Sequence, residues 1–368
     1  MDTSKKKTIV VSGINMTNSG LRSIFSDCLV FLSRYAEGKN IEIIALVHSK
    51  ALFDVQNVRF IEFPSAKKSW FIRLYYEFFY FKSLSRKLNP DVWFSLHDIS
   101  PRVVAKKKFV YCHNPTPFFT PTKSDWKFGF KISVFSLFYK YLYQLNIKSN
   151  SAVIVQQHWI KKAFEEMYKI ENVKVAHPEP YFRPIAKQII LDATKKHFFY
   201  PSFPRMFKNF ELIGDAIALL PEAIRSKIQV HFTLDDSYNS YSKYIVDTYS
   251  KYKEIHFLGV LEREAVSDYY QACDVLLFPS RLETWGLPLT EFQRYKKPIF
   301  AIDLPYALET IGNYDKAYYF SPNQPAALAA LISNYVNDDL PNPIMNKAIE
   351  APDFRNWNSL FDFIFKAV

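Results

Sequence analysis

Residues 275–291 read VLLFPSRLETWGLPLTE, in which a short apolar run is followed by a polar loop and then by Pro288. The apolar run is continuous instead of alternating, which is typical of a parallel strand that helices cover on both faces. Proline is favoured in the first turn of a helix, so Pro288 predicts that a helix begins directly after the loop. Strand, loop and helix in this order form one unit of a doubly wound α/β fold.

Similar apolar runs, each followed by a helix-like stretch, occur along the whole chain in two successive sets. The predicted strands of the first set are residues 8–12, 41–47, 58–63, 92–96, 109–112 and 152–155. Those of the second set are residues 197–200, 228–233, 255–258, 275–278, 298–302 and 318–320. Two sets of such units predict an α/β protein with two Rossmann-like, doubly wound parallel-sheet domains that face each other across a cleft.

The length of the chain also favours two domains, because 368 residues exceed what one hydrophobic core usually supports. Prolines crowd together between residues 173 and 184, as they do in linkers. We therefore place the first domain at residues 1–175 and the second at residues 176–350. The remaining residues, 351–368, include an apolar helix rich in Phe and Trp, whose simplest role is to complete the second domain.

Composition excludes several classes of protein. Apolar residues make up 49% of the chain, which is enough for a substantial core. No apolar run is long enough for a transmembrane helix, and the run after the basic N-terminus is too short for a signal peptide. Cys28, Cys112 and Cys273 are widely spaced, so we expect buried thiols in a reducing compartment and no zinc site. We therefore predict a cytoplasmic protein.

The net charge of +11 comes from the first domain, because residues 1–175 hold all the excess of Lys and Arg. Such an asymmetry indicates an anionic partner: nucleic acid, a membrane surface or an acceptor that carries phosphate. Two stretches, 67–87 and 126–148, combine cations with many aromatic residues, which suits a membrane interface. The same composition fits core helices whose lysines reach the solvent.

Two carboxylates flank the start of the helix predicted after residues 275–278. Glu283 lies in the loop and Glu291 lies about one turn into the helix, so both can face one ligand. Between them Gly286 lets the backbone approach closely, and the free amides around Leu287 suit a diphosphate. Ionised carboxylates accept hydrogen bonds from sugar and ribose hydroxyls. A helix-capping acid next to a solvated acid would give the same spacing.

Two cations follow the first predicted strand of the second domain, in residues 200–209, YPSFPRMFKN. Arg205 and Lys208 lie in the first strand-to-helix loop, at the edge of the sheet where ligands bind. A guanidinium and an ammonium can neutralise a diphosphate there, as a magnesium ion does in other proteins. The alternative is a pair of exposed loop cations without a ligand.

The Glu283-x7-Glu291 element with its Trp-Gly-Leu-Pro interior, together with Arg205-x-x-Lys208, resembles glycosyltransferase family 4, the retaining glycosyl transferases of group 1. The resemblance spans nearly the whole chain and is more specific in the second domain. It implies the GT-B fold, a first domain that binds the acceptor, a second that binds a nucleotide sugar, and a C-terminal helix that packs back toward the first domain. It also implies a retaining reaction that needs neither a metal nor a cofactor.

The resemblance assigns a role to each matching residue of the second domain. Arg205 and Lys208 would hold the diphosphate of the donor, Glu283 would contact the donor sugar, and Glu291 the ribose. The implied donor-binding residues are Trp285, Gly286, Leu287, Pro288 and Glu291. One departure lies at residues 303–306, where relatives have a glycine-rich loop and this chain has DLPY, so that Tyr306 is expected to narrow the donor pocket.

The first domain matches the family less closely. Residues 13–20, GINMTNSG, follow the first strand, but Ser19 stands where relatives usually carry the first glycine of a pair. His113 resembles the family's cleft histidine, so the implied catalytic residues are His113, Arg205, Lys208 and Glu283. The residues expected at the acceptor or a phosphate are Asn15, Gly20, His97 and Asn114. For both histidines, and for His97 above all, the alternative is a side chain that is satisfied by loop backbone.

Glycosyl transfer passes through an oxocarbenium-like state, so the departing diphosphate needs positive charge. We assign that charge to Arg205, Lys208 and the helix start at Leu287. No Asp-x-Asp motif occurs, which leaves a metal-bridged diphosphate unsupported. No residue stands out as a nucleophile, and the resemblance implies front-face attack in which the leaving phosphate helps to deprotonate the acceptor.

The predicted partners are therefore a UDP- or GDP-sugar, a saccharide or lipid-diphosphate-linked acceptor, and an anionic membrane surface on which the protein is peripheral. The resemblance suggests surface-polysaccharide or O-antigen assembly. One alternative is a sugar-nucleotide epimerase of the same fold, which would act without an acceptor. Another is a non-catalytic protein that binds nucleic acid or membrane, although no recognised nucleic-acid motif is present and we predict no nucleic-acid partner.

Overall fold

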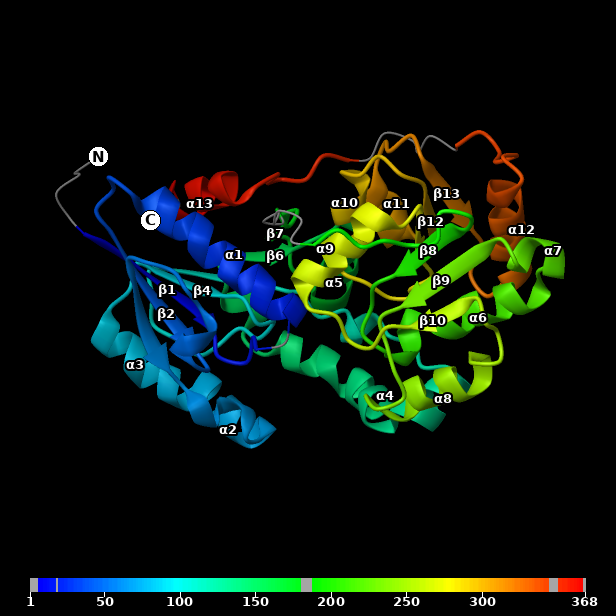
Figure 1. The fold of residues 1–368 in the computed structure, drawn as a ribbon. Coiled ribbons are helices and arrows are strands. Elements are labelled where there is room, and N and C mark those ends of the chain that lie inside the picture. Colours follow the sequence, from blue (N-terminus) through cyan, green and yellow to red (C-terminus); the bar gives the residue numbers. More distant parts are fainter. Residues whose placement is uncertain (1–5, 18, 180–186, 344–349, 367–368) are drawn as a thin grey trace. The chain divides into compact units, whose positions relative to one another are not determined.

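The computed structural model describes residues 6–17, 19–179, 187–343 and 350–366. The chain divides into two compact units, and neither is continuous in sequence (Figure 1). The first unit contains Met1–Pro117, Ser136–Tyr181 and Glu350–Val368. The second contains Phe118–Phe135 and Phe182–Ile349. Part of the predicted linker, residues 180–184, lies outside the described residues.

The first unit is built on a 7-stranded parallel sheet in the order β3-β2-β1-β4-β5-β6-β7. The strands are β1 (Lys7–Gly13), β2 (Ile41–Val47), β3 (Val58–Glu62), β4 (Val92–Ser95), β5 (Lys107–Tyr111), β6 (Ala152–Val155) and β7 (Val173–Val175). The chain order reverses between β1 and β4, which pair directly. In open parallel sheets, ligands bind outside the carboxyl ends of the strands at such a switch point.

Helices cover both faces of this sheet. They are α1 (Ser19–Ala36), α2 (Trp70–Tyr75), a π-helix (Tyr76–Tyr80), α3 (Phe81–Leu88), the second part of α4 (Lys123–Gln144), α5 (His158–Tyr168) and α13 (Trp357–Lys366). Helix α13 brings the end of the chain back to the first unit and packs on α1, where the Tyr35 ring lies 5.5 Å from that of Phe361. The backbone leading to α13 forms a parallel bridge between Phe354 and Ala176.

The second unit is built on a 6-stranded parallel sheet in the order β10-β9-β8-β11-β12-β13. The strands are β8 (Lys196–Tyr200), β9 (Ile228–Phe232), β10 (Ile255–Phe257), β11 (Val275–Phe278), β12 (Ile299–Ile302) and β13 (Ala317–Phe320). Its helices are α6 (Phe210–Leu219), α7 (Glu222–Arg225), α8 (Ser240–Tyr249), α9 (Arg263–Ala272), α10 (Leu287–Gln293), α11 (Pro305–Ile311) and α12 (Pro325–Val336). The switch point lies between β8 and β11, so the loops after these two strands are neighbours.

Helix α4 is shared between the two units, because the unit boundary falls inside it, after Phe135. The helix is also broken at Gly129, where the backbone is not helical (φ −140°, ψ 42°). A sharp change of direction in a helix commonly occurs at glycine. The segment Phe118–Phe135 therefore leaves the first unit after β5 and folds with the second.

The predicted fold class is confirmed, because both sheets are parallel and doubly wound. All the predicted strands are present, and the structure adds β7, which lies inside the stretch predicted as a linker. The three cysteines are free and buried, as expected. Within the described part of the chain, no helix combines the length and the apolar character that crossing a membrane requires.

Candidate functional site

The switch point of the second unit brings Lys208 and Glu283 together. Lys208 ends the short 3-10 turn after β8, and Glu283 lies in the loop after β11. The Lys208 ammonium donates to Glu283 Oε1, and both side chains are partly buried. The Tyr200 hydroxyl donates to the Lys208 carbonyl oxygen over 2.7 Å, which fixes the backbone under the cation. Arg205 begins the same turn, and its side chain is exposed.

Glu291 lies on α10 and contacts two side chains of α9. Its Oε1 is 3.4 Å from Arg263 Nη2, and its Oε2 accepts a hydrogen bond of 3.1 Å from the Tyr270 hydroxyl. Tyr270 is fully buried, and burial raises the pKa of its hydroxyl well above the usual value, so it remains a donor. The Glu291 carboxylate is thus held in place, and each oxygen has capacity for a further hydrogen bond.

The backbone between Glu283 and Glu291 has a conformation that lets a ligand approach it closely. Gly286 is the N-cap of α10 and has φ 86°, a left-handed conformation that favours glycine. The indole of Trp285 donates to Thr290 Oγ1 over 2.9 Å, and the Thr310 hydroxyl donates to the Trp285 carbonyl oxygen. Leu287, Pro288 and Glu291 all lie on α10, so the predicted donor-binding residues share one turn and one helix.

Tyr306 is buried on α11, and its hydroxyl donates to the Ser280 carbonyl oxygen over 2.5 Å. The side chain therefore supports the loop that carries Glu283. Its expected effect on the width of a donor pocket stays a prediction.

The first unit gathers a buried polar cluster at the ends of β1 and β4. Ser12 Oγ lies 2.9 Å from His97 Nε2, and the other ring nitrogen of His97 lies 3.3 Å from Glu77 Oε1. Arg73 Nη2 donates to the His97 carbonyl oxygen over 2.9 Å. Burial lowers the pKa of His97 well below its usual value. Both ring nitrogens of His97 therefore lie next to protein side chains, and its expected place at the acceptor stays a prediction.

Asp98 orders the backbone that carries His113 and Asn114. It has φ 74°, and its Oδ1 accepts hydrogen bonds from the His113 amide (2.6 Å) and the Asn114 amide (3.0 Å). His113 is buried, and burial lowers the pKa of its imidazole to about 3, so the ring is neutral at physiological pH. Asp98 was not among the predicted site residues, although its place two residues after the predicted strand 92–96 was the available signal.

Residues 13–17 turn tightly after β1, with the Met16 amide donating to the Gly13 carbonyl oxygen over 3.0 Å. Asn15 Oδ1 is buried in this turn and has no hydrogen-bond partner among the described residues. Gly20 lies in the first turn of α1. The expected place of Asn15 at the acceptor or a phosphate stays a prediction.

The sequence predicts that the protein needs no metal ion, and this prediction stays untested. In the described residues, His, Cys, Asp and Glu side chains do not gather in groups of three that could hold a metal ion.

Glu77 provides a pH-dependent test of the first unit. Its side chain is fully buried, and burial raises the pKa of its carboxyl from 4.5 to about 8, against the opposing charge of Arg73. Between these two pH values the folded chain keeps a proton that the unfolded chain has lost. The stabilisation is therefore fully present below about pH 4.5 and is lost as the pH rises toward about 8.

We expect Glu77→Gln, which cannot lose this proton, to gain stability relative to the unchanged protein as the pH rises through this window. The gain is on the order of a few kcal/mol, and urea unfolding at several pH values measures it. Glu222→Gln is the control, because the Glu222 side chain is 75% exposed. A stability difference for Glu77→Gln that does not change with pH would contradict the raised pKa.

The second unit contains most of the residues that match a known protein family. Residues 184–351 match the model of the family described as glycosyl transferases group 1. The O-antigen chain mannosyltransferase RfbU of Salmonella typhimurium is 20% identical over 266 residues, which cover 69% of this chain and 68% of that protein.

Solved structures share the fold over most of the chain. WaaG, a glycosyltransferase involved in lipopolysaccharide biosynthesis, has a TM-score of 0.67 at 14% identity, covering 89% of this chain and 90% of its own. A glycosyltransferase from Rickettsia africae has a TM-score of 0.64 at 17% identity, covering 90% and 88%. HepE of Anabaena in complex with UDP-glucose has a TM-score of 0.60 at 13% identity, covering 90% of each chain. At these identities the likeness shows the GT-B fold, and the match of residues 184–351 confirms the predicted enzyme class, that of a glycosyltransferase.

Proposed function

We propose that the protein is a retaining, metal-independent glycosyltransferase of family 4. It transfers a sugar from a nucleotide sugar, a UDP- or GDP-sugar, to a lipid-linked saccharide acceptor in surface-polysaccharide or O-antigen assembly. The observation that carries the proposal is the ion pair of Lys208 and Glu283 at the carboxyl ends of β8 and β11. A cation for a diphosphate and a carboxylate for sugar hydroxyls stand side by side there.

In the proposed mechanism the donor lies along the switch point of the second unit. Glu291 accepts hydrogen bonds from the ribose hydroxyls, and the amides at the start of α10 face the diphosphate. Lys208 and Arg205 stabilise the negative charge that develops on the departing diphosphate. Glu283 binds the donor sugar. In the first unit, His113 keeps its predicted catalytic role as a neutral imidazole.

Relatives support the choice of substrates. RfbU is named as an O-antigen chain mannosyltransferase, and WaaG as a glycosyltransferase of lipopolysaccharide biosynthesis. HepE has been solved with UDP-glucose. These names favour a nucleotide sugar as the donor and a growing saccharide as the acceptor.

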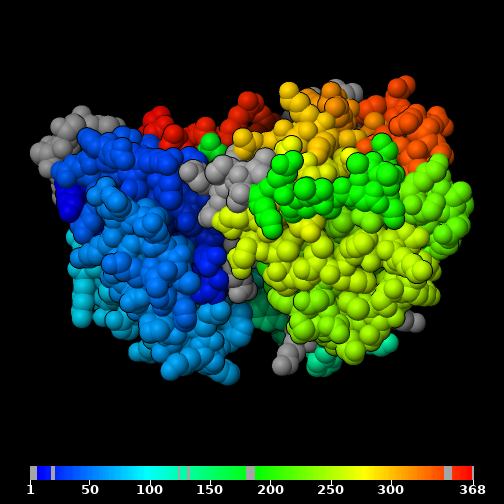
Figure 2. All heavy atoms as spheres, in the orientation of Figure 1, coloured from blue at the N-terminus to red at the C-terminus, as the bar shows by residue number. Residues whose placement is uncertain are grey.

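The proposal includes a peripheral position on an anionic membrane, which the surface of the first unit supports. Phe71 on α2 is 84% exposed and Phe79 in the π-helix is 65% exposed. Lys67 and Lys68, just before α2, are exposed as well. Figure 2 shows residues of this part of the chain, in mid-blue, on the surface of the first unit. Exposed rings next to cations are the composition that binds lipid headgroups.

A thermal-shift screen against UDP-, GDP-, dTDP- and CMP-sugars in the presence of EDTA tests the donor site. Because a ligand that binds only the folded state stabilises it, one nucleotide class should raise the melting temperature. The shift should disappear in Glu291→Ala and persist in Glu222→Ala, whose side chain is exposed on α7. The anomeric configuration of the product, read by NMR, tests retention. No shift with any nucleotide sugar would overturn the proposed donor site.

A further inference from the structure

We propose that Asp125 and Arg281 are positioning residues of the donor site. Asp125 lies in the segment Phe118–Phe135, which sequence order places between two strands of the first unit but which folds with the second. Its carboxylate holds Arg281, and Arg281 ties the loop of Lys208 to the loop of Glu283. The inference rests on the proposed function, because it assigns a purpose to the placement of those two side chains.

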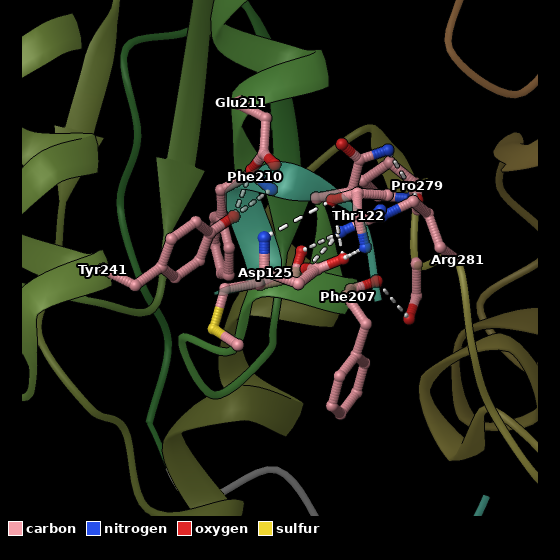
Figure 3. A network of polar contacts seen from close by, with 11 residues as sticks. Thr122, Asp125, Phe207, Phe210, Glu211, Tyr241, Pro279 and Arg281 are labelled. Carbon is pink, nitrogen blue, oxygen red and sulfur yellow. Dashed lines mark hydrogen bonds and ion pairs between the residues drawn. The ribbon is translucent and has the colours of Figure 1, made fainter. Parts of the chain in front are cut away.

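Arg281 contacts both donor-site loops and the segment Phe118–Phe135 (Figure 3). Its Nη2 donates to Asp125 Oδ1 over 2.8 Å and to the Met206 carbonyl oxygen over 3.1 Å. Its backbone amide donates to the Phe207 carbonyl oxygen over 2.7 Å. Met206 and Phe207 directly precede Lys208, and Arg281 stands two residues before Glu283. One residue therefore fixes the distance between the chain segments that carry the ion pair.

Asp125 is prepared for this contact. Its side chain is completely buried, and its Oδ2 accepts hydrogen bonds from the amide and the hydroxyl of Thr122, both over 2.7 Å. That leaves Oδ1 for the guanidinium. A buried carboxylate requires a cationic or hydrogen-bonding partner, because without one its charge is uncompensated.

Apolar contacts also fix the segment Phe118–Phe135 to the loop that carries Lys208. The ring of Phe119 lies 5.8 Å from that of Phe207 in an edge-to-face arrangement, and Leu282 belongs to the same small cluster. Gly129, at the break in α4, lies so close to Met206 that a Cβ built there would be 1.7 Å from the Met206 Cε. The segment Phe118–Phe135 thus covers the loop between Arg205 and Lys208 from one side.

A second carboxylate, that of Glu211, lies near Arg281 but is not its hydrogen-bond acceptor in the described contacts. Glu211 lies at the start of α6, and burial raises the pKa of its carboxyl, although hydrogen bonding from the Tyr241 hydroxyl and the charge of Arg281 oppose this. The Tyr241 hydroxyl in turn accepts from the Phe210 amide over 3.1 Å. Glu211 therefore helps to cap α6 through Tyr241, while Asp125 accepts the hydrogen bond that the Arg281 guanidinium donates.

The proposed role predicts which part of the donor is affected. Lys208 and Glu283 serve the diphosphate and the sugar, whereas Glu291 is held by Arg263 and Tyr270 on α9 and serves the ribose. Releasing Arg281 should therefore weaken binding of the diphosphate end and leave the nucleoside end unchanged.

Amide hydrogen exchange of the Asp125→Asn variant tests, without any ligand, whether Arg281 links the two loops. The amides of Lys208 and Arg281 donate to the carbonyl oxygens of Arg205 and Phe207, so they report on the two loops. Losing a charged hydrogen bond should speed their exchange about tenfold or more, with β9 unchanged. Asp247→Asn is the matched control, because it breaks the exposed ion pair of Lys243 and Asp247 on α8. Unchanged exchange at both amides would overturn the proposal.

Binding measurements then distinguish a positioning role at the diphosphate from a loss of structure in the whole donor site. With the base identified by the screen, Asp125→Asn should bind the nucleoside diphosphate about tenfold more weakly and the nucleoside monophosphate as before. Asp125→Glu should restore part of the difference. Equal losses for both nucleotides would overturn the positioning role. If Asp125→Asn does not fold, Arg281→Lys is used, because it keeps the charge and removes the guanidinium fork.

The outcomes for the two proposals can be told apart. If no nucleotide binds even the unchanged protein, the proposed function fails, and the hydrogen-exchange result alone decides whether Arg281 ties the two loops.

Discussion

Lys208→Met is expected to lower kcat by about 10²- to 10³-fold. The KM for the donor should change much less, because the donor does not yet carry the negative charge that a free nucleoside diphosphate has. In the proposed mechanism the ammonium faces a diphosphate whose negative charge grows as the glycosidic bond breaks. An interaction that strengthens in the transition state affects kcat more than ground-state binding. Steady-state kinetics with the identified donor, at saturating acceptor, measures both constants.

Two further variants make this result interpretable. Lys208→Met leaves Glu283 without its cation in a partly buried place, so the melting temperature is measured in parallel. Lys208→Arg keeps the charge and should retain more activity. Lys243→Met removes an exposed lysine of α8 that pairs only with Asp247 among the described residues, and it should leave kcat unchanged. A normal kcat in a folded Lys208→Met protein would rule out the assigned role.

Gly286→Ala is expected to weaken donor binding by about tenfold, which corresponds to about 1–2 kcal/mol of backbone strain. Gly286 has φ 86°, and a Cβ there would lie 3.2 Å from the Leu289 side chain and 3.3 Å from the ring of Phe278. The backbone can relieve this strain only by turning the start of α10 away from its present direction. The amides assigned to the diphosphate would move with it. Calorimetric titration with the donor measures the loss.

The chain offers a matched control for this substitution. Gly38 also has a positive φ, 69°, but nothing lies within 4 Å of a Cβ built at that position. Gly38→Ala should therefore lose stability through its backbone alone and bind the donor normally. If both variants bind alike, the geometry of Gly286 has no connection to the donor site.

The fold was predictable from sequence because each strand of a covered parallel sheet is a short continuous apolar run. The runs at 41–47, 152–155 and 275–278 coincide with β2, β6 and β11. The strand β7 escaped notice because it has only three residues, with Lys174 in the middle. Such a strand is defined by its pairing with β6, which local sequence does not contain.

The candidate site was predictable only where its residues are close in sequence or follow strands. Lys208 and Glu283 were expected at the carboxyl edge of the sheet, because each follows a predicted strand. The pairing of those two strands is known from the structure. Asp125 gave no such signal. Its partner Arg281 is 156 residues away, and nothing in the sequence indicates that a segment following β5 folds with the second unit.

The aromatic stretches 67–87 and 126–148 show how sequence leaves an alternative open. Each stretch contains both buried and exposed aromatic side chains. Phe81 and Tyr139 are buried, whereas Phe71 and Phe138 are exposed. Composition alone does not separate the two, because which side of a helix faces the sheet depends on the packing around it.

The return of α13 to the first unit has a consequence for how the protein is made. The ribosome has assembled every residue of the second unit once Ile349 is added, whereas the first unit still lacks α13. Trp357, Phe361 and Phe365 belong to its main hydrophobic core. Until they emerge, the apolar surface that they cover faces solvent, which is the kind of surface that chaperones protect. The half of the protein that is translated first is therefore the last to be completed.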